Sequence, residues 1–431
     1  MMMRRLVLAL GLVAAVGVGA CSNDEIANSQ CPVLCPQRNL QVIDTTFEAV
    51  ALDTVLTGFP VLGTEGRIML ATAPGGALDV RGLIRFDSIV PTFAPTFADT
   101  LRPITAPDSV RLVLRLDTLG SRATAPFTIE AYDVDTTVTD TATAPLAQHF
   151  RPEKLMASRT FSPDSLRDTI SIPVTNIARF VEALRTPGRV RLGFRVVSSG
   201  TAQLLIGSSD GFRDAFLRYR PAVDSGLPTF VLPPRSATPS GLPEVAAALA
   251  DYTWVVAGSG DAPAAQIAIG GMPGRRSYLS FAIPSSIVDS TDVLRATLEL
   301  TQVPYRGLRL RDTLAAYPWL VVAGPNADVT RAATLALGAF NALRQSLGLR
   351  SYTDSLRMVL SDSGVRRFDI TAAVREWRLS GPDGMRRAVV LRAGPENFET
   401  GQLRFFSREA AAGLRPRLRI VYTAKPGSGL P

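Results

Sequence analysis

VRRFDITAAVREWRLSGPDGMRRAVVLRAGPENFETGQLRFFSREAAAGLRPRLRIVYT, from Val365 to Thr423, is the stretch that decides the fold. Its pattern predicts a short strand ending near Asp369, then one or two helical turns that carry Val374 and Trp377. A Gly/Pro turn follows, and three further strands are predicted after it: Ala388–Arg392, Gln402–Ser407 and Arg417–Tyr422. Short strands separated by turn residues are typical of an all-β domain.

A weaker copy of the same order lies earlier in the chain. Residues 168–173 predict a strand, and 175–184 predict a helix in which Ile177 and Phe180 take the places of Val374 and Trp377. Two further pairs of segments match: Arg81–Pro91 with Arg276–Val288, and Asp108–Asp117 with Asp292–Thr301. The chain is therefore predicted to use one unit twice.

Length and turn spacing agree with two domains. The chain has 431 residues, 46% hydrophobic and 19% charged, which is ordinary for a packed protein of about two domains. From Val42 onward, runs rich in Val, Ile, Leu, Phe and Thr are broken at short intervals by Gly, Pro, Asp or Ser, as in β-sandwiches. The predicted segments are a first sandwich at 42–221, a Pro-rich linker at 222–250, a second sandwich at 251–423 and a flexible tail at 424–431. Within the linker, the alternative is that Phe230–Leu232 pairs at a sheet edge.

One segment departs from the strand pattern. Residues 328–347, DVTRAATLALGAFNALRQSL, place Ala and Leu at helical spacing, with Asp328 or Thr330 as the N-cap. We predict an inserted helix here that packs on its own domain.

The N-terminus resembles a bacterial lipoprotein signal. Arg4 and Arg5 precede an apolar run, Leu6–Val18, and small residues then lead to Cys21. The resemblance implies that 1–20 is a cleaved signal peptide, that Cys21 is lipidated and that 21–41 is a tether. Ser22 after the cysteine favours the outer membrane by the sorting rule of enteric bacteria. A plain secretory signal is the alternative.

Two cysteines remain, Cys31 and Cys35. Export would place them in an oxidising compartment, so we predict a local disulfide that closes a tight loop. The sequence near them offers no further metal ligands, and the sole histidine, His149, lies far along the chain.

Charge and motifs narrow the function classes. The formal net charge is +8, but arginines are scattered singly rather than clustered with aromatics, which argues against nucleic-acid binding. The sequence has no Gly-rich phosphate loop before a helix, and Gly207–Asp210 is not a nucleophile elbow. We therefore expect no cofactor, no metal and no catalytic residue.

The second domain resembles the DNRLRE-type, carbohydrate-binding-module-like β-sandwich domains of bacterial surface and secreted proteins. The residues that carry the resemblance are Tyr278–Phe281, Ala296–Leu300, Phe368–Thr371 with Val374 and Trp377, Phe405–Glu409 and Arg415–Tyr422. The first domain follows this order only loosely. The resemblance implies two tandem jelly-roll-like sandwiches, each with a short helix, and some relatives that bind glycans.

Three tryptophans are candidates for glycan stacking. Trp377 is predicted to fill the core, since it falls at helical spacing from Val374. Trp319, which follows Tyr317 and Pro318, is the best candidate for an exposed platform, and Trp254 is less determined. Asp369 and Thr371 are predicted to bind backbone groups at the strand-to-helix turn, with a calcium site as the alternative.

These features favour a noncatalytic, lipid-anchored cell-envelope protein that acts as a structural or binding module. The alternative is a surface lipoprotein that binds a polysaccharide through an aromatic platform at Trp319. An envelope hydrolase is the least supported class. Expected partners are the membrane, through the N-terminal lipid, and a polysaccharide or another envelope protein.

Overall fold

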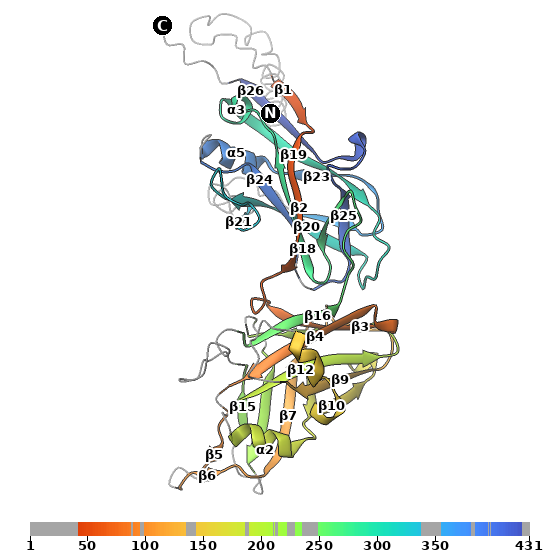
Figure 1. The fold of residues 1–431 in the computed structure, drawn as a ribbon, viewed down its shortest axis with the longest axis vertical. Helices are drawn as coiled ribbons and strands as arrows, with labels where there is room; N and C mark the ends of the chain where they lie inside the picture. The colour runs from red at the N-terminus through yellow and green to blue at the C-terminus, as the bar shows by residue number, and fades with distance from the viewer. Residues whose placement is uncertain are drawn as a thin grey trace, which may run out of the picture.

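The protein consists of two β-sandwiches stacked along one long axis (Figure 1). The computed structural model describes residues 42–87, 89–94, 99–134, 144–185, 189–209, 211, 214–221, 229–234, 249–337, 355–380, 384–394, 396 and 398–424. The all-β class with short helices is confirmed. No helix within these ranges is long and apolar enough to cross a bilayer.

One sandwich, here the discontinuous sandwich, is built from 42–59 and 266–424. Its strands are β1 (Val42–Phe47), β2 (Val50–Phe59), β17 (Gln266–Gly270), β18 (Gly274–Phe281), β19 (Thr291–Val303), β20 (Thr313–Val322), β21 (Ala333–Ala336), β22 (Leu356–Val359), β23 (Gly364–Asp369), β24 (Ala388–Gly394), β25 (Gln402–Phe406) and β26 (Arg417–Ala424). One layer contains β1, β26, β19, β23, β25 and β17, and the other contains β2, β18, β24, β20, β21 and β22. Its helices are α3 (Ser285–Val288), α5 (Thr371–Leu379) and η7 (Ala412–Leu414).

The other sandwich, here the inserted sandwich, spans 67–257. Its strands are β3 (Arg67–Ala73), β4 (Leu78–Phe86), β5 (Thr92–Phe93), β6 (Arg102–Pro103), β7 (Pro107–Arg115), β8 (Arg122–Ala123), β9 (Phe127–Asp133), β10 (Leu155–Phe161), β11 (Thr169–Pro173), β12 (Val190–Ser198), β13 (Ala202–Gly207), β14 (Phe216–Pro221), β15 (Phe230–Leu232) and β16 (Asp251–Ala257). A sheet containing β10, β9, β12, β4, β3 and β13 faces a sheet of β11, β7, β14 and β15. Its helices are α2 (Ile177–Arg185), η2 (Pro74–Gly76), η3 (Ala144–His149), η4 (Pro152–Lys154) and η5 (Pro163–Ser165).

Each sandwich buries the apolar face of its alternating strands around one aromatic from its helix. Trp377 of α5 is 1% exposed and lies in a core with Phe368 and Phe405, as predicted. Phe180 of α2 fills the corresponding place, with its ring centroid 5.4 Å from that of Tyr219. The helices predicted at these two positions are therefore confirmed.

The domain boundaries differ from those predicted, because the sandwiches exchange a strand. β2 pairs with β18 of the discontinuous sandwich, and β16 pairs with β4 of the inserted sandwich. The two exchanged strands pair in the same register. Leu56 of β2 lies opposite Arg276, and Trp254 of β16 lies opposite Arg81. Arg276 and Arg81 occupy the same position in the two copies of the repeat. The segments 42–221 and 251–423 are thus not separate domains. Local alternation predicts a strand but does not specify its partner.

Two other predictions concern chain organisation. In the expected linker 222–250, the alternative that Phe230–Leu232 pairs at a sheet edge is confirmed, because these residues form β15 and pair with β14. The helix predicted at 328–347 is wrong at its start, because Ala333–Ala336 forms β21 and pairs with β20. The unpaired edge of β20 offers backbone hydrogen bonds that override the local helix propensity. Residues 338–354 lie outside the described ranges.

The N-terminal predictions concern residues that the structure does not describe. The signal peptide at 1–20, the tether at 21–41, Cys21, Cys31 and Cys35 all lie outside the described ranges, as does most of the expected tail at 424–431. They remain predictions.

A small third core joins the two sandwiches. Met69, Ala71 and Leu205 on the inserted sandwich pack with Met272, and Phe398 lies beside them. The side-chain amide of Gln203 donates to the carbonyl of Phe398 at 3.0 Å. The two sandwiches therefore meet through packed side chains as well as through the chain connections.

Candidate functional site

Trp319 lies on the outer face of the discontinuous sandwich, but its ring is not open. The side chain is half-buried on β20, and the guanidinium carbon of Arg392 lies 4.1 Å from the ring centroid. An arginine at this distance forms a cation–π contact. The aromatic face that a sugar would use is therefore occupied on that side.

Arg392 belongs to a row of side chains that crosses this sheet. The buried carboxylate of Glu396 accepts from Arg392 at 2.7 Å and from Arg276 at 2.6 and 2.7 Å. Arg276 in turn lies over the ring of Phe59, 4.0 Å from the centroid. This aromatic–arginine row links β20, β24, β18 and β2, so it contributes to holding the exchanged strand β2 in place.

A polar cleft opens between the two sandwiches. Its volume is about 410 Å³. Its lining residues are Ala77, Leu78, Gly258, Ser259, Gly260, Pro304, Tyr305, Arg306, Gly307, Leu308, Thr400 and Arg404. They come from the β3–β4 turn of the inserted sandwich, the β16–β17 connection, the β19–β20 loop and β25 with the residues before it. The cleft is therefore formed by segments that lie far apart in the sequence.

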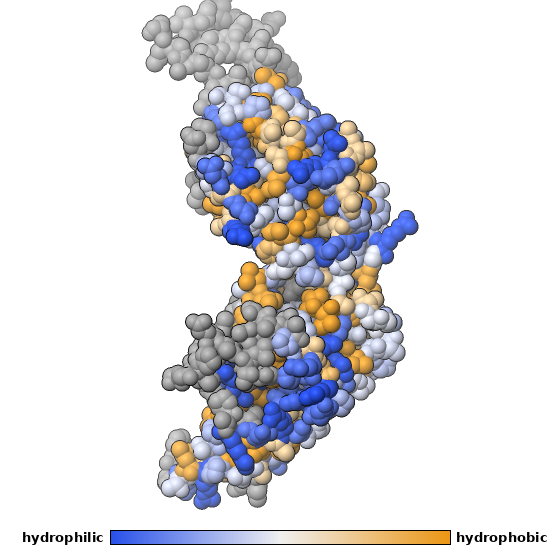
Figure 2. All heavy atoms as spheres, viewed as in Figure 1, coloured by the Kyte–Doolittle hydropathy of each residue, from blue (hydrophilic) through white to orange (hydrophobic). Residues whose placement is uncertain are grey.

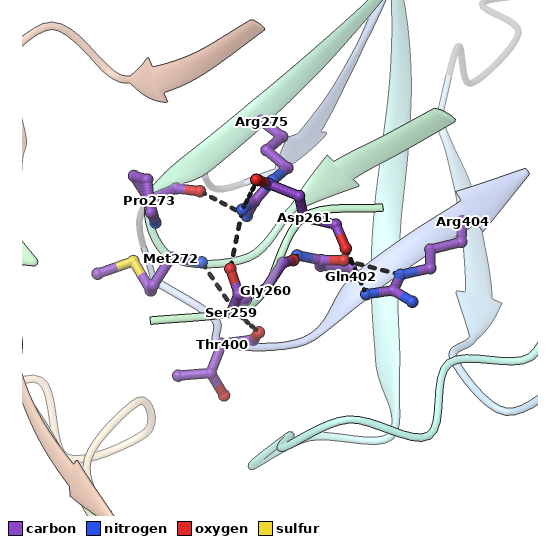
Figure 3. Close-up of polar contacts among 9 residues, drawn as sticks. All are labelled: Ser259, Gly260, Asp261, Met272, Pro273, Arg275, Thr400, Gln402 and Arg404. Atoms are coloured by element: carbon purple, nitrogen blue, oxygen red, sulfur yellow. Dashed lines mark hydrogen bonds and ion pairs between the residues drawn. The ribbon is translucent and has the colours of Figure 1, made fainter. Parts of the chain in front are cut away.

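Ser259 fixes one wall of the cleft (Figure 3). Its hydroxyl donates to the carbonyl of Thr400 at 2.5 Å and accepts from the backbone N–H of Met272 at 3.1 Å. Arg275 reaches the same connection, donating to the Ser259 carbonyl at 2.8 Å and to Asp261 at 3.0 Å. The side chain of Gln402 donates to the carbonyl of Gly260 at 2.8 Å. Because both side chains and backbone are bonded, this wall is rigid.

The cleft carries positive charge. Its lining contains Arg306 and Arg404 and no acidic residue. Arg404 donates to the side-chain oxygen of Gln402 at 2.9 Å and lies over the ring of Tyr305, 4.9 Å from the centroid. Burial lowers the pKa of the Arg404 guanidinium and raises the pKa of the Tyr305 hydroxyl. Tyr305 is buried and Arg404 is half-buried, which is the main cause of both shifts.

A second hollow of about 360 Å³ lies on the other side of Gly258. Phe59, Pro60, Trp254 and Val256 contribute its largely apolar lining. Hydrophobic residues accordingly reach the surface at the waist between the sandwiches (Figure 2). The buried carboxyl of Glu65 also lines this hollow, and burial raises its pKa to about 7.

The other sequence candidates have structural roles. Asp369 accepts from the backbone N–H of Thr371 at 2.9 Å and from its hydroxyl at 2.6 Å, which confirms the predicted turn role. Trp254 is 8% exposed and packs on Phe150. His149 ends η3, half-buried, and does not line the cleft. Among the described residues, no group of three or more His, Cys, Asp or Glu is placed to hold a metal ion.

Sequence reasoning missed the cleft residues. Arg306, Arg404 and Thr400 lie in separate segments, and the sequence around each resembles that of other loops and strands in the chain. The Gly-Ser-Gly run at Gly258–Gly260 is the one local signal, since small residues let two backbones approach closely. It does not by itself indicate a site.

Comparisons with known proteins identify neither a family nor a function for this chain. No protein-family model matches the chain, and no curated protein matches it. The solved CBM22-1–CBM22-2 tandem domain from Paenibacillus barcinonensis Xyn10C is 10% identical, with a TM-score of 0.14, covering 88% of this chain and 98% of that chain. The structure of infectious bursal disease virus Gt strain is 10% identical with a TM-score of 0.14, covering 91% and 78%. Such low scores support no argument about function, and the DNRLRE-type family stays a prediction.

Proposed function

We propose that this chain is a noncatalytic, lipid-anchored protein of the bacterial cell envelope that acts as a structural or binding module. The supporting observation is that Val42 lies opposite Thr423, so the first and last described strands pair with each other. Both lie at one end of the long axis, and α2 lies at the other (Figure 1). The segment with Cys21 precedes β1, so the anchor joins at the end opposite α2.

This arrangement would hold the inserted sandwich away from the membrane. The lipid on Cys21 is the proposed membrane contact, and the outer membrane is the proposed location. A polysaccharide or another envelope protein is the proposed partner of the exposed parts. The alternative, a glycan reader that uses Trp319 as its platform, has less support because Arg392 covers that ring.

Metabolic labelling with an alkyne-bearing fatty acid tests the anchor. The full chain, expressed in a Gram-negative host, is expected to take up the label and to fractionate with the outer membrane. The variant Cys21→Ser is expected to lose both properties, whereas Cys31→Ser keeps them. Label on the Cys21→Ser variant, or none on the wild type, would contradict the proposal.

A further inference from the structure

We infer that the cleft between the two sandwiches is a binding site for an acidic saccharide, whose carboxylate is held by Arg404 and Arg306. The inference deepens the proposed function, because it names a ligand for the binding module and places it away from Trp319. It rests on that proposal only in treating the chain as a binding protein. It does not require the lipid anchor.

Uncompensated charge is the first argument. Most arginines on these strands face a carboxylate, as Arg276 faces Glu396 at 2.6 Å. Arg404 instead contacts neutral oxygens, the Gln402 side chain at 2.9 Å and the Asp261 carbonyl at 3.4 Å. Arg306 is exposed and has no ion-pair partner in the part of the chain that the structure describes. Guanidinium groups suit carboxylates, so the cleft favours an anion.

An unpaired hydroxyl is the second argument. Thr400 lines the cleft and is 1% exposed, yet its hydroxyl has no hydrogen-bond partner among the described residues. Buried polar groups nearly always have a partner, so this hydroxyl leaves one unmet hydrogen bond in the wall of the cleft. A saccharide offers several hydroxyls spread around its carboxylate, whereas inorganic phosphate holds its hydroxyls and its charge on one small tetrahedral group.

Shape and surface chemistry agree with a polar ligand of this size. About 410 Å³ falls in the range of small-molecule sites, roughly 300–1,000 Å³. The Ser259 wall is held by hydrogen bonds from three directions, so it needs little rearrangement on binding (Figure 3). The ring of Tyr305 is buried beneath Arg404, so recognition in the cleft depends on hydrogen bonds and charge rather than on stacking.

Titration calorimetry with the purified chain tests the site. The probes are oligogalacturonate, a neutral galactan oligomer of the same length, and inorganic phosphate. We expect the acidic oligomer to bind and the neutral one to bind at least tenfold more weakly. Arg404→Gln and Arg306→Gln should each lower the affinity about tenfold or more, since each removes a charge-assisted contact. Thr400→Val should lower it by a smaller factor.

Arg331→Gln is the matched control, because Arg331 is 89% exposed before β21 and does not line the cleft. It should bind like the wild type. Arg306 is exposed, so replacing it should change binding without changing the fold. The unfolding midpoint of each variant, compared with that of the wild type, checks that the protein is folded. The inference is overturned if oligogalacturonate does not bind, if both arginine variants bind normally, or if the neutral oligomer or phosphate binds as tightly. None of these results bears on labelling of Cys21.

Discussion

Asp251 accepts hydrogen bonds from the backbone N–H and the hydroxyl of Ser209, both at 2.7 Å. This contact attaches β16 to the inserted sandwich. In the other half of the repeat, Asp53 of β2 accepts from the backbone N–H of Arg408, also at 2.7 Å. The discontinuous sandwich thus binds β2, which comes just before β3 of the inserted sandwich in the sequence. The inserted sandwich binds β16, which comes just before β17 of the discontinuous sandwich. An aspartate contact of the same kind holds both strands. The exchange is therefore a specific property of the duplicated unit.

Replacing either aspartate should loosen the exchanged strand that carries it. Asp251→Ala leaves the N–H of Ser209 without its acceptor, and Asp53→Ala does the same to Arg408. We expect each change to lower the free energy of unfolding by about 1–3 kcal/mol, measured by denaturant titration. Asp44→Ala is the control, because Asp44 only forms an exposed ion pair with Arg419. A control as destabilised as the two variants would contradict this role.

Glu65 should make stability depend on pH. Burial raises its pKa to about 7 from 4.5, and the hydrogen bonds that its carboxylate accepts come from the backbone N–H groups of Gly63 and Thr253. Between pH 4.5 and 7 the folded protein keeps a proton that the unfolded chain has lost, so stability falls as pH rises through this range. The change is at most about 3 kcal/mol.

Thermal unfolding between pH 5 and 8 checks this expectation. Glu65→Gln should flatten the profile, since glutamine does not titrate in this range. Burial also raises the pKa of Glu399 to about 7, even though Arg311 lies 2.8 Å from its carboxylate and lowers it. Glu399→Gln should therefore flatten the profile to a similar extent, and the two changes together should flatten it further. An unchanged profile in Glu65→Gln would show that its carboxyl stays ionised.

Local features of the fold could be predicted from sequence, but strand partners could not. The spacing of Ile177 and Phe180, and of Val374 and Trp377, fixed both helices and their buried faces. The repeat also predicted two sandwiches. It could not show that β2 pairs with β18 rather than with β4, because β18 and β4 carry matching residues and offer the same register. Strand pairing depends on which edges the chain brings together.

The candidate site was less predictable than the fold. Trp319 was identified by its residue type, yet Arg392, which covers its ring, is 73 residues later and reaches it only through β24. Arg404 and Arg306 line the same cleft, although one lies on β25 and the other on the β19–β20 loop. Such a site depends on tertiary contacts between segments, and none of these segments has a distinctive sequence.

Replacing Trp377 and Trp319 one at a time should distinguish a role in stability from a role in ligand binding. Trp377→Ala empties a core position and should lower the free energy of unfolding by about 3–5 kcal/mol. Trp319→Ala removes a half-buried ring and its contact with Arg392, so the loss should be smaller, about 1–2 kcal/mol. It should leave oligogalacturonate binding unchanged. Lost binding in Trp319→Ala, with normal stability, would instead favour the aromatic platform.

Cysteine pairs can test the strand exchange directly. Leu52 lies opposite Ser280 in the β2–β18 pair. Residues directly opposite in an antiparallel pair have Cα atoms about 4.5–5.5 Å apart, which is within reach of a disulfide. With the three native cysteines replaced by serine, Leu52→Cys with Ser280→Cys should therefore form an intramolecular disulfide under mild oxidation, seen by peptide mass spectrometry.

The control pair tests the arrangement without exchange. If β2 remained in its own repeat, Thr54 would take the place of Tyr252, which lies opposite Leu83 of β4. Thr54→Cys with Leu83→Cys should stay reduced, because the exchange moves β2 to another sandwich. Cross-linking of this pair would show that each repeat keeps its own strand. A dimer joined by the first pair would show that β2 is exchanged between two chains, because the register with β18 is the same whichever chain supplies the strand.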